Sequence, residues 1–312
     1  MSDPWLAAPL TLHERVRAAR ERLVAAGLAE QHAAIDAEVL ARLALGWDRA
    51  EYLARRRDEP PAGFQSAYEP LVARRARREP VAQIAGYREF WNRDFEVSRH
   101  VLTPRPETEL IVEEALMIHA SAAGAASAAA STRTSSPAGP RPWRVVDVGT
   151  GSGCLAVTLA LELRAVDVLA TDISERALAV AQRNAVRLNA VNRVHLVCTS
   201  LLEGIARGID LIVSNPPYVP DRYRSGLSSE VRDYEPAEAV FGGRDGFEVI
   251  RALLEQSGDR LAPTGWLLME FGAGQDDEVR TIVAEYPQLM VHAIRDDLQG
   301  IPRMAVIRRD GS

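Results

Sequence analysis

The sequence predicts an α/β fold in which a doubly wound, mostly parallel sheet follows a small N-terminal bundle of helices. From residue 143 onward, short apolar segments alternate with helical patterns, which is typical of parallel strands joined by helices. A glycine-rich turn separates the first of these strands from the next helix. Residues 1–82 instead carry apolar side chains at helical spacing.

The 312 residues have room for two domains of ordinary size. We expect a helical domain over residues 1–82, a connector with a strand pair over 83–110, and an α/β domain over 111–312. Thr11 and Glu14 form a capping-box pattern at the start of the first helix. Residues 120–142 carry no large apolar side chain and many of Ala, Ser, Thr, Gly and Pro, so we expect a flexible insertion there.

Net charge and the distribution of apolar residues argue against nucleic-acid-binding, secreted and membrane proteins. The formal net charge of −6 argues against a dedicated nucleic-acid binder, which usually carries a basic surplus, so we expect no stable nucleic-acid binding. No signal-peptide pattern and no apolar run of membrane-spanning length is present, which predicts a cytoplasmic protein with no membrane partner. Nothing indicates oligomerisation, and we expect a monomer.

The cysteines, histidines and arginines of the chain do not indicate a further site. The six histidines and the two cysteines have no metal-ligand spacing, so we expect no metal site. Cys154 and Cys198 lie in apolar contexts and are expected to be buried. The arginine run at residues 74–78 is expected to be a solvated helix face, with contact to an acidic or RNA-bearing partner as the alternative.

A glycine-rich turn and an acidic residue indicate a nucleoside site. Gly149, Thr150, Gly151, Ser152 and Gly153 follow a strand and open a helix. Glycines there let the backbone turn tightly and approach a ligand closely. Asp172 ends the next strand, where a carboxylate can accept hydrogen bonds from ribose hydroxyls. The Gly-x-Gly-x-Gly spacing leaves no long phosphate cradle and therefore favours a nucleoside without pyrophosphate, such as S-adenosylmethionine.

Asn215, Pro216, Pro217 and Tyr218 directly follow the fourth strand and indicate a second, chemical part of the site. Prolines cannot extend a central strand, so the chain leaves the sheet here. Asn215 offers a side-chain carbonyl, Pro216 a backbone carbonyl, and Tyr218 a flat aromatic face. Two acceptors can hold the hydrogens of a planar NH₂ group and orient its nitrogen toward a sulfonium methyl. Tyr218 can stack on the plane and face the developing positive charge.

Several motifs together resemble one known family. They are Gly86-Tyr87-Arg88-Glu89-Phe90-Trp91, Thr103-Pro104-Arg105-Pro106-Glu107-Thr108-Glu109, the glycine turn, Asn215-Pro216-Pro217-Tyr218, Tyr234-Glu235-Pro236, Gly242-Gly243-Arg244-Asp245-Gly246 and the segment Asp297 to Arg303. This set is similar to the HemK-like (PrmC) peptide chain release factor glutamine N5-methyltransferases. The resemblance covers most of the chain, so it is more specific than any one motif.

The resemblance implies a Rossmann-like S-adenosylmethionine-dependent methyltransferase domain and an N-terminal helical domain that binds the substrate. It implies methylation of the glutamine in the Gly-Gly-Gln loop of release factors, which would be the protein partners. By the same resemblance, residues 149–153 and Asp172 bind the cofactor, and residues 215–218 hold the glutamine. Asn215 is also expected beside the cofactor. Ser200 and Leu201 stand where the family commonly has an acidic residue and an aromatic near the adenine.

Two other functions remain open at this point. The same Asn-Pro-Pro-Tyr chemistry would serve an N6-adenine methyltransferase acting on DNA or RNA, which should have a basic cleft and a target-reading domain. The chain could also be a binding module that keeps the fold without chemistry. The negative net charge argues against the first, and the intact Asn215, Pro216 and Tyr218 argue against the second. Arg105 and Glu107 could either form ion pairs and caps or contact substrate.

Overall fold

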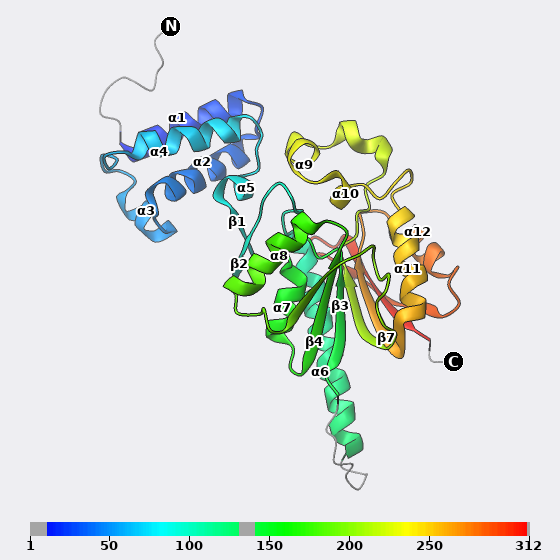
Figure 1. The fold of residues 1–312 in the computed structure, drawn as a ribbon. Coiled ribbons are helices and arrows are strands. Elements are labelled where there is room, and N and C mark those ends of the chain that lie inside the picture. The colour runs from blue at the N-terminus through cyan, green and yellow to red at the C-terminus, as the bar shows by residue number, and fades with distance from the viewer. Residues whose placement is uncertain (1–10, 131–140, 311–312) are drawn as a thin grey trace. The chain divides into compact units, whose positions relative to one another are not determined.

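The computed structural model describes residues 11–130 and 141–310, which form two compact units (Figure 1). The first unit contains the described residues up to Tyr87 together with Ser228–Tyr234, and the second contains Arg88–Leu227 and the chain from Glu235 onward. The chain therefore leaves the second unit for seven residues before it returns. None of the helices in the described ranges is long and apolar enough to cross a membrane.

The first unit is helical. Its elements are α1 (Leu12–Ala25), α2 (Glu30–Leu45), α3 (Arg49–Arg55), α4 (Phe64–Ala76), α5 (Val81–Ala85) and α9 (Ser229–Tyr234). The capping box predicted at Thr11 and Glu14 is confirmed, since each side chain accepts a hydrogen bond from the other residue's backbone N–H. Leu23, Leu40 and Tyr68 belong to one buried apolar cluster, and the Tyr68 hydroxyl donates to the Ala37 carbonyl at 2.9 Å. Every helix of this unit except α9 contributes to that cluster or packs against it.

The arginine run at residues 74–78 is a solvated face only in part: Arg77 is exposed, but Arg75 is buried and Arg74 and Arg78 are half-buried. Arg75 is 6% exposed and its guanidinium donates to Asp36 (2.7 Å) and to Glu230 of α9 (3.0 Å). Arg78 donates to the same Glu230 at 2.8 Å, and Arg74 pairs with Glu79. Arg75 and Arg78 thus hold α9 against the C-terminal end of α4, because a guanidinium can satisfy more than one acceptor in a fixed geometry.

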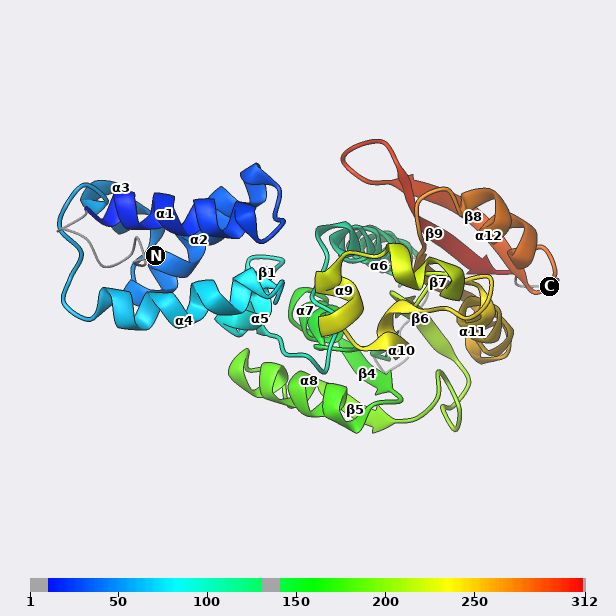
Figure 2. The same ribbon diagram turned by 90° about the horizontal axis from the view of Figure 1, so that it is seen from above.

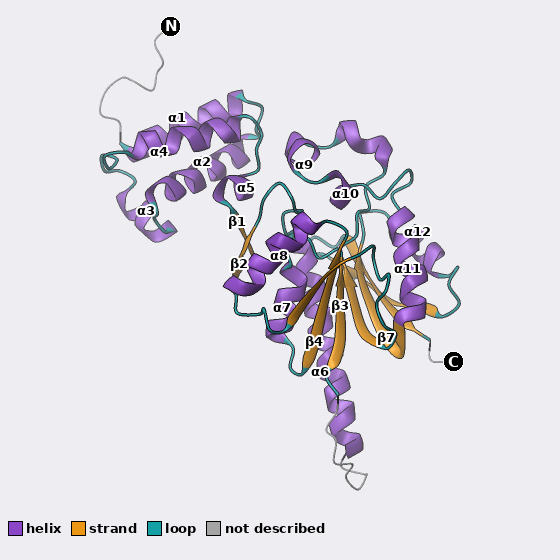
Figure 3. Cartoon of the chain, in the orientation of Figure 1, coloured by secondary structure: helices purple, strands orange, loops and turns teal. Residues whose placement is uncertain are grey.

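The second unit contains a seven-stranded sheet (Figure 3). Its strands are β3 (Trp143–Val148), β4 (Val166–Asp172), β5 (Val194–Cys198), β6 (Ile209–Ser214), β7 (Leu261–Glu270), β8 (Leu289–Asp296) and β9 (Pro302–Arg309). The order is β5-β4-β3-β6-β7-β9-β8, in which β9 runs in the direction opposite to the other six strands. The predicted mostly parallel sheet is confirmed. The chain moves outward from β3 to β5 and then returns to β6 on the other side of β3, which places a topological switch point between β3 and β6.

Helices cover both faces of this sheet (Figures 1 and 2). On one face α6 (Glu109–Ala130), α7 (Cys154–Glu162) and α8 (Glu175–Arg187) pack on residues such as Val145. On the other, α11 (Glu248–Arg260) and α12 (Asp276–Val283) pack on residues such as Val146. Neighbouring residues of a strand point to opposite faces, so Val145 and Val146 are both buried and the strand is apolar throughout.

Shorter elements complete the unit. They are the strand pair β1 (Tyr87–Phe90) and β2 (Arg93–Glu96), the 3₁₀ turns η2 (Pro106–Thr108) and η3 (Asp221–Gly226), and α10 (Ala237–Val240). The strand pair that we expected in the connector is present. Its Phe90 and Phe95 pack edge to face and join the core beneath α6 and α7.

Two expectations need correction. Residues 120–130, expected in a flexible insertion, continue α6, because their alanine-rich sequence has the highest intrinsic helix propensity even without large apolar side chains. Residues 131–140 of that segment lie outside the described residues. Cys154 is buried as expected, but Cys198 is exposed because it ends β5, which is an edge strand of the sheet.

Candidate active site

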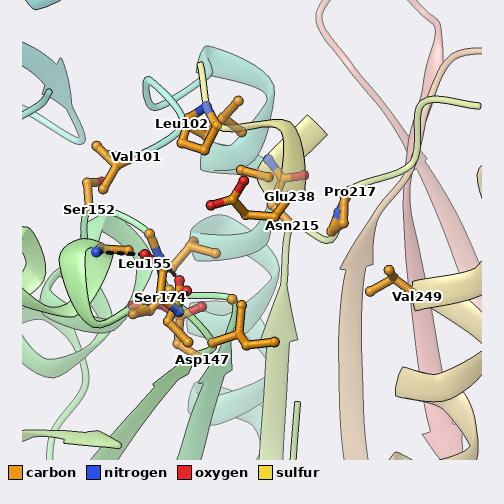
Figure 4. Close-up of a pocket in the computed structure, with 18 of the residues that line it drawn as sticks. Val101, Leu102, Asp147, Ser152, Leu155, Ser174, Asn215, Pro217, Glu238 and Val249 are labelled. Carbon is orange, nitrogen blue, oxygen red and sulfur yellow. Dashed lines mark hydrogen bonds between the residues drawn. The ribbon is translucent and has the colours of Figure 1, made fainter. Parts of the chain in front are cut away.

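A cavity of about 500 Å³ lies at the carboxyl edge of the parallel strands (Figure 4). Its wall is built from the turns after β3, β4, β5 and β6, from the connector before α6, and from α10 and α11. The strand-end residues in that wall are Gly149, Thr150, Gly151, Ser152, Asp172, Thr199, Ser200, Leu201, Asn215 and Pro217. The cavity therefore lies at the switch point, where ligands of such sheets bind, and its volume suits a nucleoside-sized molecule.

The glycine turn is fixed by hydrogen bonds to the next strand. Gly149 and Thr150 both donate their backbone N–H to the Thr171 carbonyl at 2.9 Å. Asp172 accepts from the N–H of Gly151 and from that of Ser174, each at 2.9 Å, one on each carboxylate oxygen. Burial raises the pKa of Asp172, and these backbone hydrogen bonds oppose the rise. The Asp172 carboxylate is thus held in a fixed orientation at the cavity wall.

Asp147, the last but one residue of β3, also lines the cavity and is 1% exposed. Its Oδ2 accepts from the Thr150 hydroxyl at 2.6 Å and from the Ala156 N–H at 3.0 Å. Its Oδ1 is buried and receives no hydrogen bond from the described residues. Burial raises the pKa of Asp147 to about 7 although both hydrogen bonds lower it. A buried acceptor without a donor is costly, and because Asp147 lines the cavity, its Oδ1 is placed to accept a hydrogen bond from a molecule bound there.

Asn215 begins the loop after β6 and is oriented by residues that the sequence alone did not single out. Its Nδ2 donates to the Thr108 hydroxyl at 3.0 Å, and that hydroxyl donates to Glu270 Oε2 at 2.6 Å. The Tyr218 hydroxyl donates to Glu270 Oε1 at 3.4 Å. Thr108 is 3% exposed and Glu270 is 2% exposed, so this network is buried. Burial raises the pKa of Glu270 to about 7, while the Thr108 hydrogen bond lowers it and the nearby Glu107 raises it.

The backbone of the segment Gly242–Gly246 packs closely against the backbone of the Asn-Pro-Pro-Tyr loop. Gly242 donates its N–H to the Val219 carbonyl at 3.0 Å. A Cβ on Gly242 would lie 2.5 Å from the Pro217 carbonyl oxygen, and one on Gly246 would lie 2.5 Å from that of Tyr218. Both distances are shorter than real contacts, so only glycine allows this approach. The motif therefore shapes the loop and supplies no side chain to the cavity.

The Tyr-Glu-Pro motif fixes the connector that covers the cavity. Glu235 accepts from Arg105 at 2.6 Å and from the Thr103 N–H at 3.4 Å, and its side chain is 2% exposed. Arg105 forms the ion pair that was one of its two expected roles, and it also lines the cavity, where the other role, contact with substrate, stays a prediction. Burial raises the pKa of Glu235, and the Arg105 guanidinium opposes that rise. Thr103 and Arg105 thus hold the segment 100–105, which lines the cavity through His100, Leu102 and its neighbours.

Most residues expected at the site do meet at one cavity. Gly153, Pro216 and Tyr218 do not line it. Gly153 instead packs against α8, where an added Cβ would lie 3.0 Å from the Ala181 Cβ. Asp147, Thr108 and Glu270 were not expected as site residues. A charged residue within the apolar strand of Val145, Val146 and Val148 is the one signal that could have identified Asp147.

Comparisons with known proteins agree with this architecture. Residues 14–86 match the model of the PrmC N-terminal domain, and residues 137–228 match that of the methyltransferase small domain. The crystal structure of the hMettl16 catalytic domain, solved in complex with a 3′UTR hairpin, shares the fold with a TM-score of 0.53 at 16% identity, covering 78% of this chain and 82% of that chain. At that identity the likeness shows the fold alone.

Curated relatives are similar over nearly the whole length. A release factor glutamine methyltransferase of Koribacter versatilis is 40% identical over 89% of this chain and 92% of its own. One of Bradyrhizobium diazoefficiens is 36% identical over 99% of this chain and 98% of its own. The predicted α/β methyltransferase fold with its helical N-terminal region is therefore confirmed, and the chain belongs to the family of release factor glutamine methyltransferases.

Proposed function

We propose that this enzyme transfers the methyl group of S-adenosylmethionine to the side-chain amide nitrogen (N5) of the glutamine in the Gly-Gly-Gln motif of peptide chain release factors. The names of relatives that are 36–40% identical along nearly the whole chain support the reaction and the substrate. Within the structure, the position and hydrogen bonding of Asn215 are the observation that supports the proposal. It lies in the cavity wall, its Nδ2 is engaged by Thr108, and its Oδ1 accepts no hydrogen bond from the described part of the chain.

The cavity fits the proposed cofactor. S-adenosylmethionine carries two positive groups, an ammonium and a sulfonium, and the acidic residues of the cavity wall are Asp147, Asp172, Glu238 and Glu248. The Oδ1 of Asp147 needs a donor, which the ammonium supplies. Asp172 would accept from the ribose hydroxyls, and Ser200 and Leu201 would contact the adenine. When bound, the cofactor supplies an electrophilic methyl group on its sulfonium.

The protein's own contribution to the reaction is mainly positioning. A glutamine amide is a weak nucleophile because its nitrogen lone pair is delocalised. The Asn215 Oδ1 and the Pro216 carbonyl would accept its two hydrogens and thus hold the nitrogen toward the methyl group, which lowers the entropic part of the barrier. The Tyr218 ring would lie along the amide plane and face the positive charge that develops on nitrogen. No general base needs to act before the methyl group moves.

The test uses labelled S-adenosylmethionine with a purified release factor, the same factor with its Gly-Gly-Gln glutamine replaced by alanine, and bare DNA. Label on the intact factor alone, mapped to the glutamine by mass spectrometry, is the expected result. Equal labelling of the alanine-substituted factor would contradict the proposed acceptor. Label on DNA adenine alone would mean that the acceptor is a planar NH₂ group, as proposed, but that of adenine and not that of glutamine.

A further inference from the structure

One buried carboxylate, that of Glu270, is hydrogen-bonded to the first and last side chains of the Asn-Pro-Pro-Tyr loop, directly to Tyr218 and through Thr108 to Asn215. It accepts directly from the Tyr218 hydroxyl at 3.4 Å and reaches Asn215 through the Thr108 hydroxyl, with distances of 2.6 and 3.0 Å. The four residues come from three places in the fold: η2, the end of β7, and the loop after β6. Neither Thr108 nor Glu270 lies near the loop in sequence, so their convergence is a property of the fold.

Counting hydrogens fixes the direction of this network. A threonine hydroxyl has one hydrogen and two lone pairs, and an ionised carboxylate can only accept. The shortest contact of the Thr108 hydroxyl is with Glu270, so its hydrogen lies on that bond. Its lone pairs then require a donor, which only the NH₂ end of the Asn215 amide supplies. The reversed amide would place its carbonyl oxygen against those lone pairs with no hydrogen between them.

The orientation of the Asn215 amide decides whether it can bind the nitrogen of the substrate that accepts the methyl group. With Nδ2 on Thr108, the carbonyl oxygen of Asn215 is left for a ligand in the cavity, and no described residue donates to it. The reversed amide would present NH₂ to the NH₂ of the substrate, which is a donor facing a donor. The two amide orientations have nearly the same shape, so hydrogen bonding and not packing has to distinguish them.

We propose that Thr108 and Glu270 are positioning residues that fix the Asn215 amide with its carbonyl oxygen toward the acceptor nitrogen of the substrate. The inference rests on the proposed function for its consequence in catalysis. Glu270 sets the Thr108 hydrogen, Thr108 sets the Asn215 amide, and the same carboxylate anchors Tyr218 through its hydroxyl. A single buried acid thereby sets the orientation of the Asn215 amide through Thr108 and accepts the hydrogen bond of the Tyr218 hydroxyl.

Thr108→Val tests this with almost no change of shape, because it replaces only the hydroxyl by a methyl group. Thr108→Ser is the rescue variant, since it keeps the hydroxyl. Thr158→Val is the matched control: Thr158 is also fully buried, but its hydroxyl has no partner among the described residues and does not line the cavity. The assays are run at pH 8, where Glu270, with its pKa of about 7, is ionised.

We expect kcat for release factor methylation to fall about 10- to 100-fold in Thr108→Val. This is less than the roughly 10²- to 10³-fold fall on loss of a direct electrostatic contact to the reacting group, because Thr108 acts through Asn215. The Kd for S-adenosylmethionine should stay within threefold of wild type. Thr108→Ser and Thr158→Val should keep kcat within threefold. A Thr108→Val enzyme with wild-type kcat, or a Thr108→Ser enzyme as slow as Thr108→Val, would overturn the proposal.

A second readout does not depend on activity. In ¹⁵N-labelled protein, the Asn215 side-chain NH₂ signals, identified by their loss in Asn215→Ala, should exchange slowly with solvent in wild type, Thr108→Ser and Thr158→Val. They should exchange at least about tenfold faster in Thr108→Val. Unchanged exchange in Thr108→Val would refute the orientation by Thr108. A wild-type enzyme that methylates no glutamine would reject the proposed function, and the exchange rates would still decide this inference.

Discussion

Replacing Asp147 by asparagine separates cofactor binding from folding. Both structural hydrogen bonds at this position are accepted by Oδ2, from the Thr150 hydroxyl and the Ala156 N–H. An asparagine can place its carbonyl oxygen there and keep both bonds. Its NH₂ group then occupies the position of Oδ1, the atom without a donor. The variant should therefore fold normally while it presents donors to the cofactor's ammonium in place of an acceptor.

The substitution should weaken cofactor binding and, at high pH, remove a destabilising charge from the cofactor-free protein. A hydrogen bond between charged groups contributes about 1.5–3 kcal/mol, so its loss should raise the Kd for S-adenosylmethionine about 10- to 100-fold. Without cofactor, burial raises the pKa of Asp147 from 3.8 to about 7, and at 1.36 kcal/mol per pKa unit an ionised Asp147 costs at most about 4 kcal/mol.

The direction of the pH effect is set by which state holds the proton. Between pH 3.8 and about 7, the unfolded chain has released the Asp147 proton and the folded protein still binds it. This group's contribution to the free energy of unfolding therefore falls as pH rises through that window. Asparagine does not titrate. At pH 8 the cofactor-free variant should be at least as stable as wild type, and cofactor should raise its unfolding temperature less.

Isothermal titration calorimetry and thermal unfolding at pH 8 check both effects. Asp210→Asn is the matched control, because Asp210 lies near the opposite end of β6 and pairs with Arg141, away from the cavity. It should bind cofactor as wild type does. A folded Asp147→Asn protein that binds S-adenosylmethionine within threefold of wild type would refute the assignment of Asp147 to the ammonium.

Three further predictions concern other parts of the chain. Asn215→Ala should lower kcat at least about 100-fold while the Kd for cofactor changes less than threefold; retained turnover would contradict its role. Gly153→Ala should lower the free energy of unfolding by about 1–3 kcal/mol, because Gly153 has φ +79° and its new Cβ would meet Ala181; an unchanged urea midpoint would refute this. Arg75→Ala leaves Asp36 without its guanidinium partner and Glu230 with Arg78 alone, and should cost on the order of 3 kcal/mol, whereas Arg49→Ala, at an exposed pair, should cost less than about 1 kcal/mol by the same urea assay.

Periodicity and turn chemistry were enough to predict the sheet and the ends of its strands. Asp172 and Asn215 each follow an apolar segment directly, and parallel strands bring such positions to one edge. The prediction that they share a site therefore needed no knowledge of side-chain packing. The exposure of Cys198 did require strand order, because apolar spacing does not distinguish an edge strand from a central one.

The buried network beneath Asn215 could not be predicted in the same way. Thr108 and Glu270 are 162 residues apart and meet because the fold brings η2 to the carboxyl end of β7. Each has an ordinary local explanation, a threonine before a helix and an acid after an apolar strand. Their role depends on which atoms donate, which sequence spacing does not encode. Such residues are found in the structure, by identifying the buried hydrogen bond that leaves an acceptor of the site free for substrate. Thr108→Val tests whether the Thr108 hydroxyl has this role at Asn215.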